Sequence, residues 1–213
     1  MKSRLRVQIL VSIAAFVILG CEFLGRGIGP VQPSAVSKQD GTSVKAGFEP
    51  ADCSATGLTF ENITTGNNDF EPYDGPHLIC NSVTTGSHGL NEIHHVNINK
   101  YQLESINTAF EVQKAVYSPI VDEAVAWKEK NPSSGTEVVM IRDDGVGYIY
   151  LILTNANIQG CLLGEGYGVE MIDQYLVNLN FSSCEGDAAN YAAAIETLRV
   201  TARLAVERVE NGQ

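Results

Sequence analysis

Basic residues are scarce in this sequence. Its 213 residues include 14 Lys and Arg against 25 Asp and Glu, which gives a formal net charge of −11. Binding to nucleic acid depends on Lys and Arg patches that neutralise phosphates, and electrostatic attachment to anionic lipids depends on the same side chains. The composition therefore argues against nucleic acid as a partner, and against a charged surface that holds the folded part on a membrane.

A long apolar segment is also missing. The main apolar run, residues 7–20 (VQILVSIAAFVILG), is shorter than the roughly 20 residues that span a bilayer. Three basic residues and no acid precede it: Lys2, Arg4 and Arg6. A basic segment followed by a short apolar run is typical of a secretory signal peptide. An uncleaved signal anchor is the alternative, and Glu22 argues against it because it closes the run abruptly.

The apolar run ends in Ile18-Leu19-Gly20-Cys21. These four residues resemble the lipobox of bacterial lipoproteins, in which leucine is more usual than isoleucine at the first position. The resemblance implies cleavage before Cys21, a diacylglycerol thioether on its sulfur and acylation of the new amino group, for example by palmitate. Several acyl chains make a durable anchor, whereas one gives marginal binding. The resemblance therefore predicts a signal peptide over residues 1–20 and a lipid anchor on the extracytoplasmic side of a membrane.

The rest of the chain divides into a linker and one domain. Residues 21–47 are rich in Gly and Pro, with scattered Ser and Lys and no sustained period, which is typical of a flexible tether. Residues 48–213 have the length of a single domain. That length is too small for the two-lobed solute-binding proteins that many lipoproteins are.

No two cysteines have C-x-x-C spacing, and only His77 lies close to a cysteine in the sequence, so we predict no metal site. An exported chain enters a compartment where disulfides persist. The four cysteines of the predicted domain allow three pairings. The short enclosed segments favour Cys53–Cys80 and Cys161–Cys184.

The patterns of the domain predict an α+β fold with a mainly antiparallel sheet and helices packed on one face. We also expect a short helix or strand near residues 58–63. The order of elements loosely resembles that of PsbP- and Mog1-type α/β/α sandwiches. Strand patterns cover residues 77–84, 91–102, 136–143, 146–155, 158–168 and 173–181, and helical patterns cover residues 104–117, 118–131 and 187–209.

Three local signals refine these elements. Ser118-Pro119 either begins a second helix or marks a kink in a continuous one. Asp144-Gly145 predicts a hairpin with a type I′ turn. The C-terminal segment is an amphipathic helix with Asp187 as N-cap. The expected inner residues of the second and last helical segments are Ile120, Ala124 and Trp127, and Tyr191, Ile195, Leu198, Ala202, Ala205 and Val209.

The stretches with chemical potential do not match known catalytic patterns. His94 and His95 are adjacent on a strand, so they face opposite ways and cannot bind one metal. Residues 86–89 (GSHG) lack the spacing of a nucleophile elbow. Residues 164–168 (GEGYG) lack the dinucleotide spacing and suggest a turn or bulge, and residues 142–147 (RDDGVG) lack the EF-hand ligands. We predict no catalytic, cofactor-binding or metal-binding residue.

The sequence therefore predicts where in the cell the protein lies more firmly than it predicts a molecular activity. The leading hypothesis is a membrane-anchored module of the cell envelope that binds an unknown protein or small molecule, or that supports an envelope assembly. One alternative is a small cell-envelope hydrolase, although no catalytic motif supports an enzyme. The other alternative is a sensor or a transporter-associated domain.

Overall fold

The computed structural model describes residues 47–54, 59–86, 89–155, 161–184 and 186–212. The predicted signal peptide, Cys21 and nearly all of the predicted linker lie outside these residues. The described part contains a seven-stranded antiparallel sheet and both long helices. It is therefore an α+β structure, as the sequence predicts.

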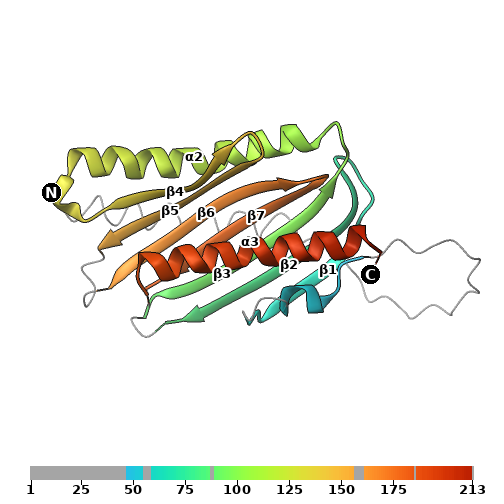
Figure 1. Cartoon of the computed structure of the whole chain (residues 1–213), viewed down its shortest axis with the longest axis horizontal. Helices are drawn as coiled ribbons and strands as arrows, with labels where there is room; N and C mark the ends of the chain where they lie inside the picture. The colour runs from blue at the N-terminus through green and yellow to red at the C-terminus, as the bar shows by residue number, and fades with distance from the viewer. Residues whose placement is uncertain (1–46, 55–58, 87–88, 156–160, 185, 213) are drawn as a thin grey trace, which may run out of the picture. The chain divides into compact units, whose positions relative to one another are not determined.

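Two meanders build the sheet, whose strand order is β1-β2-β3-β7-β6-β5-β4. The first comprises β1 to β3 and the second β4 to β7, and they join where β3 pairs with β7. Helix α2 carries the chain from β3 to the far edge of the sheet, and α3 follows β7 (Figure 1). The elements are η1 (Pro50–Ser54), β1 (Asn62–Asn68), β2 (Tyr73–Thr85), β3 (Asn91–Tyr101), α2 (Ile106–Lys130), η2 (Pro132–Ser134), β4 (Glu137–Asp144), β5 (Gly147–Asn155), β6 (Leu162–Ile172), β7 (Tyr175–Ser183) and α3 (Ala188–Glu210).

The helices cover opposite faces of the sheet, so the expectation that both pack on one face is wrong. In β5, Ile149 and Leu151 belong to the core that includes α3. Tyr148, which precedes Ile149, belongs to the core that includes α2, and Tyr150, which lies between the two, packs against that core. Side chains alternate across a strand, and β5 is buried on both sides. Strands that are apolar on both faces need a cover on each, which is why the helices are divided.

Helix α3 matches the sequence prediction closely. All six residues expected on its inner side are buried, and Asp187 caps the helix by accepting a hydrogen bond from the Asn190 N–H at 2.9 Å. Residues 164–168 lie within β6, as the strand pattern over residues 158–168 predicts, and the turn or bulge predicted for their glycines is wrong. A Cβ at Gly166 would lie 2.6 Å from the Ile195 Cδ1 atom, so this glycine allows α3 to approach the sheet closely.

Helix α2 is continuous through Pro119, which is the second of the two alternatives for this segment. Its buried residues are Ile106, Phe110 and Val121. Trp127, expected on the inner side, is 38% exposed. The buried side of α2 is set by the apolar residues that begin at Ile106 and continue through Pro119 without a break. This side is therefore rotated about the helix axis relative to the predicted one.

Two other local predictions need correction. The short helix or strand expected near residues 58–63 is the polar edge strand β1, which begins only at Asn62. Strand β2 starts at Tyr73 rather than at residue 77. The β4–β5 turn consists of Gly145 and Val146, neither of which has a positive φ, so it is not type I′. Instead, the Asp144 carboxylate accepts a hydrogen bond from the Val146 N–H at 2.9 Å and holds the turn.

Both disulfides that the loop lengths favour are present. Cys53–Cys80 joins η1 to β2, with the Cα atoms 5.7 Å apart. Cys161–Cys184 joins the segment before β6 to the end of β7, with the Cα atoms 5.6 Å apart. Disulfides persist in oxidising compartments, so the pairs indicate an extracytoplasmic environment. No helix in the described part of the chain is long and apolar enough to cross a membrane.

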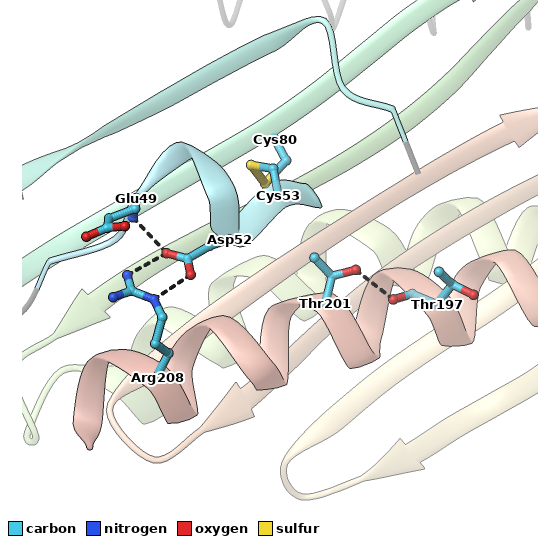
Figure 2. Close-up of a disulfide and its surroundings, with 7 residues drawn as sticks. All are labelled: Glu49, Asp52, Cys53, Cys80, Thr197, Thr201 and Arg208. Carbon is cyan, nitrogen blue, oxygen red and sulfur yellow. Dashed lines mark hydrogen bonds and ion pairs between the residues drawn. A yellow bond between two sulfur atoms is a disulfide. The ribbon is translucent and has the colours of Figure 1, made fainter. Parts of the chain in front are cut away.

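An ion pair holds η1 on α3 beside the first disulfide (Figure 2). The Arg208 Nε and Nη2 atoms donate to the two oxygens of Asp52 at 2.6 and 2.7 Å, and Asp52 is buried. The second oxygen of Asp52 also accepts from the Glu49 N–H at 2.7 Å. The start of the domain is thus fixed to the sheet by a covalent bond and to the last helix by a bidentate, charge-assisted contact.

A second ionic cluster fixes α3 to the other half of the sheet. Glu170 of β6 is 2% exposed and is surrounded by arginines. Arg199 of α3 donates to both of its oxygens at 2.9 Å, and Arg142 of β4 also donates to it. Arg203 lies 3.7 Å away. A buried carboxylate needs such partners, because its desolvation is costly without them.

Candidate functional site

Part of one sheet face has no helix over it among the described residues. Helix α2 packs against β4, β5, β6 and β7, whereas α3 and η1 occupy the opposite face of the sheet. On the α2 side, β1, β2, β3 and the adjoining part of β7 present a half-buried surface that we call the open face. Its central side chains are His77, Asn81, His95, Asn97, Asn99, Asn178 and Asn180.

The strand register aligns these side chains in rows. Directly paired residues of antiparallel strands lie on the same face and are close neighbours. Carboxamides therefore lie next to one another across three strands, bordered by Tyr167 and Val169 of β6. The rows are Asn81–His95–Asn180–Tyr167, Ile79–Asn97–Asn178–Val169 and His77–Asn99.

Hydrogen bonds between the amides orient part of this surface. The Asn68 Nδ2 atom donates to Asn99 Oδ1 at 3.3 Å. The Asn99 Nδ2 atom donates in turn to Asn97 Oδ1 at 2.8 Å. The chain of amides runs from β1 to β3 and presets the orientation of two open-face residues.

Two polar atoms on this face are buried and have no hydrogen-bond partner among the described residues: Asn178 Oδ1 and His77 Nδ1. Buried polar atoms in folded proteins are nearly always paired, and each exception calls for an explanation. Both residues are only half-buried as a whole. Other parts of both side chains therefore reach the surface, where an external group can approach them. The unsatisfied atoms mark the open face as a surface with hydrogen bonds still to make.

The open face carries no charge from its four strands. These strands contain three charged residues, Asp74, Glu92 and Lys100. Asp74 lies in the register shift between Tyr73 and His77, beyond the rows of the open face. Glu92 and Lys100 have the opposite parity and point to the α3 side. There, the Lys100 Nζ atom pairs with Glu210 at 3.1 Å, and Glu92 accepts a hydrogen bond from the Ser183 hydroxyl at 2.9 Å. In a protein of net charge −11, this surface is neutral.

Burial shifts the pKa values of titratable groups on the open face and at its border. Burial lowers the pKa of His77 and of His95 below the ordinary value for histidine, because a desolvated imidazolium is disfavoured. At the border with α2, burial raises the pKa of Glu165 for the same reason, against the effect of the Tyr167 hydroxyl that donates to it at 3.3 Å. Neither imidazole is charged at neutral pH.

Helix α2 presents an apolar flank beside the open face. Tyr117 lies on the side toward β6, with its ring centroid 6.0 Å from that of Tyr167. Lys114 points the other way, to Asp143 of β4 at 3.6 Å. At 100° per residue, Val116 and Trp127 lie on the flank of Tyr117, away from Lys114. These two residues are 50% and 38% exposed.

The structure separates the two adjacent histidines as predicted. His95 belongs to the open face, whereas His94 stacks on Phe181 of the α3 side with ring centroids 5.5 Å apart. Ser82 is paired with His94 across the strands and Glu92 lies nearby. Among the described residues no hydrogen bond joins a serine hydroxyl to a histidine.

Of the remaining motifs, residues 164–168 reach the border of this face through Glu165 and Tyr167. Ser87 and His88 of the GSHG stretch lie outside the described residues. Within the described ranges there is no group of three or more His, Cys, Asp or Glu side chains that could hold a metal ion. The sequence analysis did not predict the open face. The signal for it is a polar residue at alternate positions of central strands, as in Asn97-Ile98-Asn99 and Asn178-Leu179-Asn180.

No protein-family model matches the chain, and no significantly similar curated protein was found.

Proposed function

We propose that the protein is a membrane-anchored, extracytoplasmic binding module of the cell envelope, with its ligand on the open face. The observation that carries the proposal is a neutral, amide-rich sheet surface with two buried polar atoms that lack partners. Polar residues in central strands cost stability that apolar residues would supply. A face built in this way favours recognition over packing.

Binding is favoured over hydrolysis by the arrangement of the titratable groups. An enzyme of acyl or glycosyl transfer needs a nucleophile beside a base, or two facing carboxylates. The four strands of the open face place no carboxylate on it, and its histidines have no acidic partner among the described hydrogen bonds. A sensor or transporter-associated domain remains compatible with the same surface, since both act by binding.

The anchor is tested by Cys21→Ser. The resemblance of residues 18–21 to a lipobox predicts that this variant is no longer lipidated, because the sulfur that accepts the lipid is lost. Fractionation and metabolic labelling with a tagged fatty acid should show loss of label and either release from the membrane fraction or accumulation of a larger precursor. Cys53→Ser, which leaves Cys21 intact, is the control and should keep its label. Unchanged labelling of Cys21→Ser contradicts a lipid on this residue.

The open face is tested by binding of purified full-length protein, in mild detergent, to washed envelope from the producing cells. We expect co-sedimentation of the wild type and at least a tenfold loss for Asn180→Asp or Asn81→Asp, since each places a charge on a neutral surface. Asn107→Asp makes the same change at an exposed position of α2 on the flank away from the open face. This control should bind within about twofold of wild type. Equal binding by all four proteins contradicts the proposal.

A further inference from the structure

We infer that the ligand of the open face is a neutral glycan, bound by hydrogen bonds from its hydroxyl groups to the asparagine carboxamides. The inference rests on the proposed function, because it names the ligand class of the same face. It depends on three features: the absence of charge, the mixture of donors and acceptors, and the apolar flank of α2.

The absence of charge removes most other ligand classes. Phosphorylated or carboxylated ligands are recognised through Arg and Lys, and no Arg or Lys of the four strands lies on this face. Cationic ligands are held by carboxylates or by cages of several aromatic faces, and the central side chains of the open face include neither. A surface that presents only neutral polar groups is complementary to a neutral polar ligand.

The donors and acceptors fit hydroxyl groups. A carboxamide both donates and accepts, and a hydroxyl does the same, so either orientation of an asparagine finds a partner on a sugar. The unpaired Asn178 Oδ1 atom can only accept and needs a donor from outside. A sugar hydroxyl provides that donor and retains lone pairs for a neighbouring amide. The two-dimensional array across β2, β3 and β7 offers such partners to consecutive sugar units.

The flank of α2 provides the apolar contact that sugars also need. Trp127 and Val116 are exposed on the side of α2 toward the open face. Aromatic rings present an apolar body to a ligand, and the C–H faces of a pyranose are the apolar surface that such a ring contacts. An extended peptide is less suited to the face, because peptides usually add to a sheet edge or dock apolar anchors. Among the rows of amides the face offers one half-buried aliphatic side chain, Ile79, and Val83 and Ile93 lie at one end of these rows.

The test uses purified full-length protein and surfaces that carry three sets of immobilised oligosaccharides. One set contains neutral hexose and N-acetylhexosamine oligomers, one contains uronic acid oligomers, and one contains oligomers with free amines. We expect binding to members of the neutral set only. The affinity should change less than twofold between 50 and 500 mM salt, because salt screens contacts between charges and this face has none.

Two variants localise the binding. Asn180→Asp should weaken it at least tenfold, and the matched Asn107→Asp should leave it within about twofold. Preference for a charged set, strong salt dependence, or equal binding by Asn180→Asp overturns the inference. Envelope co-sedimentation that depends on Asn180, together with no binding to any glycan set, rejects the glycan and leaves the proposed function standing. Concentration-dependent dimerisation that Asn180→Asp abolishes would identify a second copy of the chain as the occupant and would also overturn the inference.

Discussion

Replacing Glu170 with alanine should lower the free energy of unfolding by about 3–5 kcal/mol, the usual cost of removing one partner from a buried ionic cluster. Glu170 is 2% exposed, and Arg142 and Arg199 both donate to its carboxylate. Without it, two guanidinium groups face each other between β4, β6 and α3 with no carboxylate between them. For a domain of this size the unfolding temperature should fall by about 6–20 °C. Urea unfolding followed by circular dichroism measures the change.

The matched control is Glu196→Ala. The Glu196 carboxylate also binds Arg199, at 2.6 Å, but its side chain is 51% exposed. Exposed ion pairs contribute about 0–1 kcal/mol, so this variant should stay close to wild type. A second variant, Glu170→Gln, keeps the shape of the side chain and isolates the charge. If Glu170→Gln costs less than about 1 kcal/mol, the cluster does not hold α3 on the sheet through its charge.

Removing the Cys53–Cys80 disulfide with the double variant Cys53→Ala/Cys80→Ala should cost about 3.5 kcal/mol. The two cysteines are separated by 27 residues. Closure of a loop of this length lowers the entropy of the unfolded chain, and at 25 °C this loss stabilises the folded state by about 3.5 kcal/mol. The bidentate Asp52–Arg208 pair still holds η1 on α3 in the variant. We therefore expect a folded protein with a lower unfolding temperature rather than an unfolded one.

The second disulfide gives the matched comparison. Cys161 and Cys184 are separated by 23 residues, so their removal should have a similar effect, about 3.4 kcal/mol. Reduction and alkylation of the wild type should cost more than either double variant, because both cross-links are lost at once. If non-reducing peptide mapping finds four free thiols in this domain, the cross-links and the oxidising compartment that they indicate are both contradicted.

The sequence predicts α3 well because the spacing of apolar residues within this one helix is enough to identify its buried side. The inner residues from Tyr191 to Val209 recur at helical spacing and meet one sheet face, so burial follows directly from periodicity. The disulfide pairs are equally local, since each encloses a short segment. For these features no knowledge of distant contacts is needed.

The distribution of the helices over two faces could not be derived in the same way. It depends on which strands become central, and that follows from the pairing of β3 with β7, two strands far apart in the chain. The stripe of Ile120, Ala124 and Trp127 predicts an inner Trp127, whereas the residues that α2 buries start at Ile106. The glycines of β6 suggested a turn because their role, contact with Ile195, lies in another element.

The open face cannot be predicted from the sequence either, because it also depends on contacts between distant segments. Asn97 and Asn99 alternate with apolar residues in β3, and Asn178 and Asn180 do so in β7, which is the ordinary pattern of a half-exposed strand. Only the register shows that the two pairs are neighbours, and only the position of α2 shows that no helix covers them. The open face thus depends on the order of the strands in the sheet, although β3 and β7 each show the alternation of asparagine and apolar residues that contributes to it.

The most direct test of the open face is a nuclear magnetic resonance titration of isotope-labelled protein with a neutral oligosaccharide. The side-chain amide signals report on each asparagine separately. We predict the largest chemical-shift changes at Asn97, Asn178 and Asn180, with little change at Asn190, which lies at the start of α3. Changes confined to α3 and η1, or spread evenly over the domain, would contradict the assignment of the open face as the ligand surface.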